Sequence, residues 1–419
     1  MQKLNTVKGT KDLFGDIANS HQKIYRIFSE ISSFFNFQPI STPILENEKI
    51  FIKTLGKSSD IISKEMYNFT DQGGDNLVLR PEGTAAVARA LISNSLQEDH
   101  NKSFFYYGPM FRRERPQSGR LRQFHQIGVE VFGEKNFLDD IKVIILAEKF
   151  LEKIGIRKDL SLQINTLGNY ESRRRYTDEL KIFLKKNLDR LSDDSKKKIN
   201  INPLRILDSK NTKDIEVIEK APKINEFLDD ESYWFFDEFS KSLKRLGVKF
   251  KINPYLVRGL DYYNHTTFEY LTNSQKSQNT VLAGGRYDGL IKSLGGSDLS
   301  GIGWAAGVER ILMLTQPFKV EKKIISLFTT SEDLNFKMLE IYNELIVEDK
   351  FSVNLILGKN FKKKITKADK LNSFGCVIVG DDELKKNQLI WKDFVSGNQE
   401  IFPIGNLNDF LTKKINEKK

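Results

Sequence analysis

Five arginines lie within eleven residues of the chain, and a strand-like segment with two different faces follows them. These arginines are Arg112, Arg113, Arg115, Arg120 and Arg122. Guanidinium groups bind carboxylates and phosphates through paired hydrogen bonds. Side chains alternate along a strand, so the apolar residues at positions 127, 129 and 131 are expected to face a core. Phe124, Gln126 and Glu130 then face the other way. An aromatic plane, an amide and a carboxylate beside guanidinium groups suit a base, a zwitterion and a phosphate chain.

The turn residues within the arginine cluster predict a long hairpin over 104–132. Pro116, Ser118 and Gly119 lie midway along it and are typical of a turn. An arginine-rich hairpin on a solvated sheet edge is the alternative interpretation. The ordered alternation of the following strand favours a binding site.

Two glycine-rich segments, 256–270 and 282–290, carry further polar groups. The first places Arg258 before a glycine and adds two adjacent tyrosines. In the second, paired glycines allow a backbone or a ligand to approach closely, and Tyr287 lies beside them. An ordinary tight turn is the alternative for each segment.

A third segment, GIGWAAGVERILML at 301–314, leads from small residues into a helix that ends near Leu314. Its apolar positions face a core, and Arg310 points away from that core. The glycines are spaced G-x-G-x-x-x-G and follow a loop rather than an apolar strand. A dinucleotide-binding oxidoreductase is therefore disfavoured.

Composition limits the class of protein. A chain of 419 residues with 39% hydrophobic content predicts two or three globular domains. The chain has no run of about 18 apolar residues, and residues 1–12 are polar, so we expect a cytoplasmic protein without a membrane span or signal peptide. The formal net charge of +10 hints at a polyanionic partner.

Cysteine and histidine are rare. The single cysteine, Cys376, excludes an internal disulfide and is expected to be buried. The histidines, His21, His100, His125 and His265, are scattered and predict no zinc-type ligand set. A metal would then be a hard cation held by oxygen ligands and substrate phosphates, Mg²⁺ above all.

The chain divides into segments of different texture. Helical spacing at 24–34 precedes a strand at 37–43, and an alanine-rich helix is expected over 84–96, after the loop Arg80-Pro81-Glu82-Gly83. Another helix is expected over 139–154. Residues 169–245 are highly charged and helical, which indicates an inserted module. After residue 317, strands and helices alternate, which indicates a separate α/β domain with at least some parallel strands.

These segments together resemble the class II aminoacyl-tRNA synthetases, and specifically the histidyl-tRNA synthetase family, over nearly the whole chain. FRRERP…GRLRQFHQ resembles motif 2 of that class, GIGWAAGVERILML resembles motif 3, and the stretch around Pro43 resembles motif 1, which builds the dimer interface. LVRGLDYYNHTTFEY and AGGRYDGL are similar to signatures of the histidine enzymes.

The resemblance implies an α+β fold: a class II core built on a six-stranded antiparallel sheet, with a helical insertion and a C-terminal α/β anticodon-binding domain. It places the first part of the core, with motifs 1 and 2, at 1–168 and the inserted helical domain at 169–245. The second part of the core, with motif 3, spans 246–319, and the anticodon-binding domain spans 320–419. No arginine follows Arg310, which leaves open how the last domain reads an anticodon.

The resemblance also implies a role for each site residue. Arg112 and Arg258 would be catalytic, holding the α-phosphate. The histidine-binding residues would be Glu82, Gly83, Thr84, Arg112, Gln126, Glu130, Arg258, Tyr262, Tyr263 and Tyr287. The ATP-binding residues would be Arg112, Glu114, Arg120, Phe124 and Arg310. Within these sets, Glu130 and Tyr263 would bind the imidazole, and Phe124 would stack on adenine.

The implied reaction activates histidine with ATP, as the substrate together with Mg²⁺, and transfers it to the 3′ end of a cognate tRNA. A homodimer with no membrane partner is expected. One alternative is a histidine-sensing regulatory subunit of ATP phosphoribosyltransferase, which resembles the core but typically loses the motif arginines and the last domain. Another is a pure RNA-binding module, which would not need Glu82, Gln126 and Glu130 together.

Overall fold

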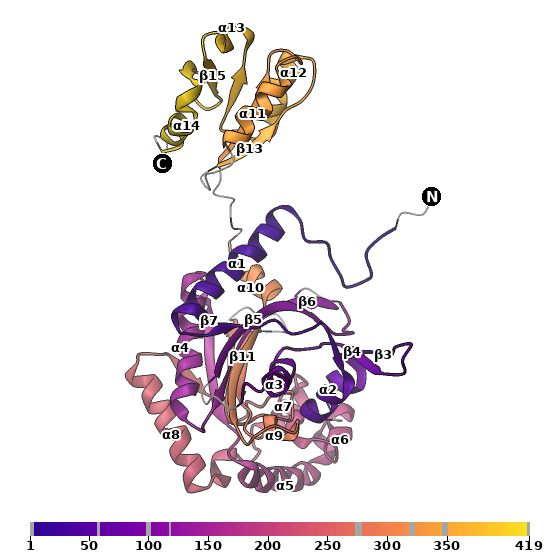
Figure 1. Cartoon of the computed structure of the whole chain (residues 1–419). Helices are drawn as coiled ribbons and strands as arrows, with labels where there is room; N and C mark the ends of the chain where they lie inside the picture. Colours follow the sequence, from indigo (N-terminus) through magenta and orange to yellow (C-terminus); the bar gives the residue numbers. More distant parts are fainter. Residues whose placement is uncertain are drawn as a thin grey trace. The chain divides into compact units, whose positions relative to one another are not determined.

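The computed structural model describes residues 4–56, 59–97, 102–116, 119–272, 279–316, 318, 323–345 and 351–416. The chain forms two compact units, Met1–Phe318 and Lys319–Lys419, and each has its own sheet (Figure 1). Among the described residues, no helix is long and apolar enough to cross a membrane.

The first unit is built on an eight-stranded sheet in the order β1-β5-β6-β11-β10-β9-β7-β8. In that order the strands are Gln38–Pro39, Lys102–Phe111, Gln123–Gly133, Ser300–Gly307, Thr280–Arg286, Asn264–Thr272, Leu160–Thr166 and Phe250–Ile252. The six inner strands pair antiparallel throughout. The short edge strands β1 and β8 pair parallel with their neighbours. The expected six-stranded antiparallel core is confirmed, and the two edge strands add to it.

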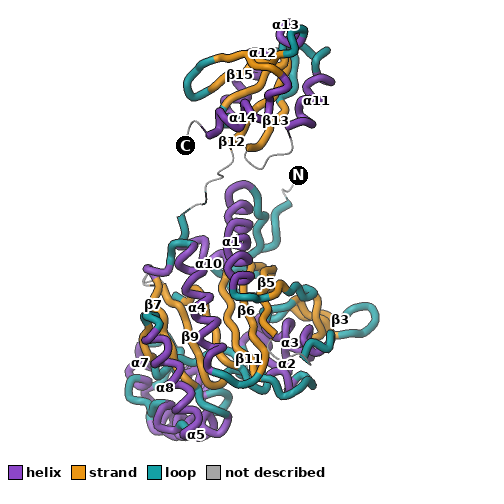
Figure 2. Tube along the Cα trace, turned by 60° about the vertical axis from the view of Figure 1, so that its left-hand side comes forward, coloured by secondary structure: helices purple, strands orange, loops and turns teal. Residues whose placement is uncertain are grey.

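Three helices cover one face of this sheet. They are α1 (Gly15–Phe34), α4 (Phe137–Lys153) and α8 (Asp230–Arg245), and Figure 2 shows α4 alongside the strands. Phe28 of α1 and Phe150 of α4 pack against Trp304 of β11, and all three side chains are buried. The predicted core-facing positions 127, 129 and 131 of β6 belong to this core. The other face of β6 is therefore left for a ligand.

The opposite face carries the elements that border the site. They are α2 (Glu48–Leu55), α3 (Thr84–Ser93), α9 (Leu290–Ser293) and a small sheet of β2 (Leu45–Asn47), β4 (Asn76–Leu79) and β3 (Tyr67–Thr70). The helix α10 (Val308–Leu314) instead contacts α1 and contributes to the core that α1 and α4 share. The alanine-rich helix α3 ends at Ser93, three residues before its predicted end. Ser95 has a left-handed φ of 54°, which an α-helix does not accommodate.

The charged segment after β7 forms further helices. These are α5 (Tyr170–Lys186), α6 (Asp193–Lys198) and α7 (Thr212–Ile218), followed by α8. Each begins at a side chain that accepts a hydrogen bond from a first-turn amide, and these caps are Asn169, Ser192, Asn211 and Asp229. The caps explain why so polar a sequence forms several short helices.

The second unit contains a five-stranded sheet in the order β13-β12-β14-β15-β16. The strands are Phe351–Leu355, Lys323–Thr329, Gly375–Val379, Gln388–Asp393 and Gln399–Pro403, and the helices are α11 (Asn335–Leu345), α12 (Phe361–Lys370), α13 (Asp381–Leu384) and α14 (Leu407–Asn416). The first three strands are parallel and the last two antiparallel, as the alternation of strands and helices suggested. Cys376 of β14 is fully buried, and its burial raises the thiol pKa to about 12.

Candidate active site

A cavity of about 190 Å³ opens on the ligand face of the sheet, next to the strand that follows the arginine cluster. Its wall includes most of the predicted site residues: Glu82, Thr84, Arg112, Glu114, Arg120, Phe124, Gln126, Arg258, Tyr262, Tyr263 and Arg310. Three predicted residues, Gly83, Glu130 and Tyr287, are absent from the wall, and Glu130 and Tyr287 are almost fully buried. Ser118 of the predicted turn lies outside the described residues. The fold thus joins segments that lie far apart in sequence.

One end of the cavity is cationic. Arg112 donates from Nε to the carbonyl of Pro81 at 2.9 Å, and its guanidinium lies over the Phe124 ring at 5.4 Å from the centroid. Arg120 forms an ion pair with Glu114, with Nε and Oε2 2.8 Å apart. These contacts hold the guanidinium groups beside the aromatic plane. Such an arrangement suits a nucleotide with its phosphates.

Arg310 joins this end from the first turns of α10. Its Nη1 donates to the carbonyl of Thr280 at 2.6 Å. Burial lowers its pKa, and the neighbouring Arg120 acts in the same direction. Glu114 opposes that shift. A polyanion entering the cavity would relieve the repulsion between these cations.

Arg258 lies deeper and is held by a carboxylate that the sequence did not single out. Its Nη1 donates to Glu269 of β9, and its guanidinium lies over the Tyr263 ring at 5.6 Å. Glu269 also accepts from the Thr280 hydroxyl at 3.0 Å. The sequence could have indicated this carboxylate, because Glu269 stands between two aromatic residues, Phe268 and Tyr270, in a strand-like segment. Both neighbours are fully buried.

Carboxyl groups mark the other end of the cavity, with Glu82 in its wall and Glu130 buried behind it. Glu130 has no exposed surface and accepts hydrogen bonds from the Thr84 hydroxyl at 2.7 Å and from the Tyr287 hydroxyl. The Tyr106 hydroxyl lies 3.4 Å from the same carboxylate. Burial raises the Glu130 pKa to about 8, and the bonds from Thr84 and Tyr287 offset part of that rise. A pKa of about 8 keeps the carboxyl mostly protonated at neutral pH.

Glu82 caps the helix that borders this end. Its two oxygens accept from the backbone amides of Thr84 and Ala85, both at 2.8 Å. Burial raises the Glu82 pKa, and the bonds from the Ala85 and Thr84 amides oppose the rise. The Oε1 of Gln126 is buried without a hydrogen-bond partner among the described residues. A ligand ammonium group would satisfy that acceptor.

Aromatic rings and glycines shape the space around Glu130. The Tyr262 and Tyr263 ring centroids are 4.6 Å apart, and the Tyr287 ring lies edge-on to both. At Gly303, an added Cβ would lie 2.0 Å from an oxygen of Glu130. At Gly83, an added Cβ would lie 2.3 Å from the Tyr106 ring. Glycine is therefore needed at position 83 for a steric reason, because a larger residue would clash with the Tyr106 ring.

Two further arginines that the sequence interpretation missed support this end from outside. Arg286 is buried; it donates to Asp140 of α4 and lies 3.2 Å from Asp288, which ties β10 to the helical face. Arg173 of α5 donates from Nη1 to the carbonyls of Asp261 and Tyr263, both at 2.8 Å. The charged helical segment therefore braces the tyrosine loop directly.

The fold also brings together ligand-type side chains from distant segments. His21, His125 and Glu309 offer ligand atoms that all lie within 4.8 Å of one another. The scattered histidines predicted no zinc-type ligand set, so this grouping was not anticipated from the sequence. The three residues are far apart in the sequence but lie on three different elements that the fold brings together. His100 lies outside the described residues.

Comparison with known proteins gives two family matches. The family model described as histidyl-tRNA synthetase matches residues 9–311, and an anticodon binding domain matches residues 323–414. The histidine–tRNA ligase of Rhodospirillum rubrum is 42% identical over 414 residues, which cover 99% of this chain and 100% of that protein.

Solved structures agree with these matches. The apo histidyl-tRNA synthetase of S. aureus superimposes with a TM-score of 0.80 at 29% identity, covering 97% of this chain and 99% of the other. A Bacillus halodurans C structure described as an ATP phosphoribosyltransferase regulatory subunit/histidyl-tRNA synthetase gives 0.67 at 19% identity, over 91% and 99% of the two chains. That second likeness concerns the fold alone.

Proposed function

The chain belongs to the histidyl-tRNA synthetase family, and from this premise we propose how its cavity performs the reaction of the family. The protein activates histidine with ATP and ligates it to tRNA. The observation that carries the proposal is a single cavity with guanidinium groups at one end and buried carboxyl groups at the other. This polarity matches histidine joined to ATP through its carboxylate.

In the first half-reaction, the histidine carboxylate would attack the α-phosphorus of ATP. A bond forms between a carboxylate oxygen and the α-phosphorus. The bond between that phosphorus and the oxygen bridging to the β-phosphate breaks, and pyrophosphate leaves with the electron pair. Arg112 and Arg258 would stabilise the charge that develops on the α-phosphate. Arg120 and Arg310 would bind the terminal phosphates, and Phe124 would stack on adenine. Alignment in the cavity supplies much of the acceleration, and no covalent enzyme intermediate is needed.

Histidine would be selected at the acidic end. The unpartnered oxygen of Gln126, with Glu82 and Thr84, would receive the α-ammonium group. Glu130 and Tyr263 would bind the imidazole, and the neighbouring tyrosine rings would enclose it. A site built to pair an N–H rejects side chains that leave its carboxyl group without a partner. In the second half-reaction the histidyl group passes from the adenylate to the terminal ribose of tRNA, and AMP leaves.

Mg²⁺ would arrive as the magnesium complex of ATP and would neutralise phosphate charge when bound. Two carboxylates at the cationic end are already paired with arginines, Glu114 with Arg120 and Glu269 with Arg258. Mg²⁺ prefers to keep water and phosphate oxygens as ligands. The donor set therefore fits an ion carried mainly by the triphosphate, with Glu114 as the nearest protein carboxylate of the ATP set.

Amino-acid-dependent ATP–pyrophosphate exchange, measured with each of the twenty amino acids, tests this function. We expect exchange with histidine alone. The regulatory-subunit alternative predicts histidine binding without exchange, so the same preparation should be checked for histidine binding by calorimetry. Binding without exchange would contradict the proposal. Exchange with a different amino acid would contradict the specificity assigned to Glu130.

For the second unit we propose contact with the anticodon stem of tRNA through α12. Lys362, Lys363 and Lys367 of this helix are exposed, whereas Lys364 is buried and donates to the carbonyl of Thr329 at 2.9 Å. Exposed lysines bind phosphates as point charges. The buried lysine instead holds α12 to β12.

Changing Lys362, Lys363 and Lys367 together to glutamine should weaken tRNA binding and reduce its salt dependence, because each lost phosphate contact removes about 0.7–0.9 from the log–log slope. Lys386→Gln, an exposed change elsewhere in the unit, is the control. A chain ending near Lys319 should likewise keep histidine-dependent exchange but charge tRNA poorly. Unaltered charging in both variants would contradict the assignment of this unit.

We also propose that the protein works as a cytoplasmic homodimer. The stretch that resembles motif 1 is flanked by apolar side chains at the surface: Ile44 and Leu45 are 42% and 49% exposed. Such side chains are typical of a surface that a partner covers. Sedimentation analysis should give twice the mass of one chain, and Leu45→Lys should shift the protein toward the monomer.

A further inference from the structure

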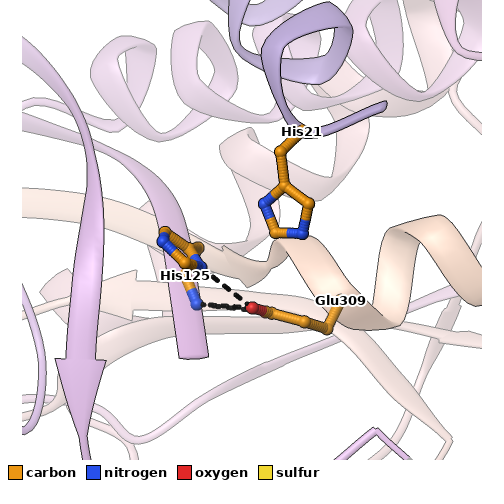
Figure 3. Close-up of side chains that lie close together, drawn as sticks. All are labelled: His21, His125 and Glu309. Carbon is orange, nitrogen blue, oxygen red and sulfur yellow. Dashed lines mark hydrogen bonds and ion pairs between the residues drawn. The ribbon is translucent and has the colours of Figure 1, made fainter. Parts of the chain in front are cut away.

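Three residues from different parts of the chain meet beside the cavity. His21 comes from α1, His125 from β6 and Glu309 from the first turn of α10, and Figure 3 shows the imidazole rings and the carboxylate converging. Their ligand atoms lie within 4.8 Å of one another. His21 is buried, and the other two side chains are each 16% exposed. The family motifs cover His125 and Glu309, but His21 lies outside them.

Neighbouring groups fix the orientation of these side chains. The backbone amide of His125 donates to both oxygens of Glu309 at 3.0 Å, and Nδ1 of His125 lies 3.0 Å from Oε1. The His21 ring meets the His125 ring edge-on at 4.9 Å. The Tyr107 hydroxyl lies 3.4 Å from Nδ1 of His21, and the Tyr107 ring stacks on His125. Partners of this kind orient ligands in metal sites.

Two imidazoles and one carboxylate form a ligand set that protein zinc sites use, with a fourth position left for water. At metal–ligand distances of about 2.0–2.2 Å, ligand atoms of a tetrahedral site lie roughly 3.3–3.6 Å apart. The His125–Glu309 pair, at 3.0 Å, is slightly closer than this, and a third ligand atom within 4.8 Å needs to approach by only about 1 Å. Imidazole nitrogens disfavour Mg²⁺ and favour zinc or a similar first-row ion.

We propose that His21, His125 and Glu309 bind one divalent first-row cation, Zn²⁺ by preference, at the junction of α1, β6 and α10. This ion would be separate from the Mg²⁺ that accompanies ATP. It would link β6 to α10. Phe124 precedes His125 on β6, and Arg310 follows Glu309 on α10. The bound ion would therefore stabilise the cationic end of the cavity.

The test uses the full-length, untagged protein without substrates. Zn²⁺ affinity and stoichiometry are measured against a chromophoric chelator, and Co²⁺ replaces Zn²⁺ to give a visible ligand-field spectrum. We expect one equivalent of metal and a spectrum typical of tetrahedral coordination. In His21→Phe, which keeps an aromatic ring against His125, affinity should fall by about 100-fold or more. The Zn²⁺ affinity of His21→Gln should fall similarly, which would show that the loss in His21→Phe is not caused by altered packing.

His265→Asn is the matched control. His265 is also buried but belongs to β9, and asparagine tolerates its positive φ of 43°. This variant should bind metal as the unmodified protein does. Zn²⁺ should raise the melting temperature of the unmodified protein and of this control but of neither His21 variant. Equal affinity in the His21 variants, or the absence of a bound equivalent in the unmodified protein, would overturn the site.

Discussion

The two ends of the cavity hold their charged groups in opposite ways. At the phosphate end, Arg120 and Arg258 are paired with carboxylates, Glu114 and Glu269. At the histidine end, Glu130 is surrounded by hydroxyl groups, with no ion pair among the described residues. The first end therefore holds these arginines in ion pairs. At the second, burial raises the Glu130 pKa to about 8, which favours the neutral carboxyl group at neutral pH.

The difference follows from the chemistry of the two groups. A guanidinium group stays protonated in proteins, so Arg120 and Arg258 keep their charge and are compensated by carboxylates where no phosphate is bound. A carboxyl group can respond to burial by keeping its proton. The phosphate end should therefore exchange one anion for another on binding, whereas the histidine end should ionise when an imidazole N–H is offered.

Arg258→Ala should have the largest effect, because it removes charge from the transition state and leaves Glu269 unpaired. We expect the exchange rate to fall by roughly 10²–10³, equivalent to about 3–4 kcal/mol. Arg258→Lys should restore little, since a point charge lacks the paired donors of a guanidinium. Histidine-dependent exchange under saturating substrates measures the change.

Arg157 provides the matched control for that variant. It pairs with Glu148 and lies over the Tyr270 ring at 5.5 Å, which closely parallels Arg258, Glu269 and Tyr263, yet it does not line the cavity. Arg157→Ala should cost stability and leave exchange nearly normal. If both variants lowered exchange to the same extent, the effect of Arg258 would be structural.

Glu130→Gln tests the histidine end. The substitution keeps the size of the side chain but removes the acceptor that can ionise against the imidazole. A hydrogen bond to a charged group contributes about 1.5–3 kcal/mol, so the histidine KM should rise by roughly one to two decades, with the ATP KM less affected. Steady-state exchange kinetics with each substrate varied give both constants. A large loss of stability with an unchanged histidine KM would instead assign Glu130 a structural role.

The sequence was sufficient for the fold and for the strand that organises the cavity. The alternation in β6 placed Gln126 and Glu130 on the ligand face, because a half-buried strand fixes the direction of every second side chain. The inner antiparallel sheet was implied by the family resemblance, and the parallel strands of the second unit were predicted from the alternation of strands and helices. The strand expected at 37–43 forms only as β1, Gln38–Pro39, and β8 was not predicted, since three residues carry too little pattern.

The contacts that support the site could not be read from the sequence. Glu269 pairs with Arg258 only because β9 and the loop at 256–263 fold together. Arg173 braces the tyrosine loop from a helix about ninety residues away in the chain. His21 meets Glu309 from the opposite end of the unit. Such pairs depend on tertiary geometry, on which local periodicity gives no information.

Arg120→Ala should have a smaller effect than Arg258→Ala, which sharpens the contrast between buried and exposed cations. The Arg120 side chain is 39% exposed and paired with Glu114, so solvent screens its charge. We expect the ATP KM to rise by no more than about tenfold, a loss of about 1.4 kcal/mol, with little change in the histidine KM. An effect as large as that of Arg258→Ala would show that exposure does not rank these arginines.

The smallest expected effect is a change in how stability depends on pH. Burial raises the Glu130 pKa from 4.5 to about 8, so the folded protein prefers the protonated group. The corresponding stability is fully present below pH 4.5 and is lost as the pH rises toward 8. Glutamine does not titrate. In the absence of histidine, Glu130→Gln should therefore become more stable relative to the unmodified protein between pH 5 and 8, by an increment on the order of a few degrees in Tm. Tm measured across that range for both proteins provides the comparison, with Glu231→Gln, an exposed carboxylate on α8, as the control. A Tm difference that stays constant with pH would mean that Glu130 is ionised when no histidine is added, and the contrast between the two ends of the cavity would then fail.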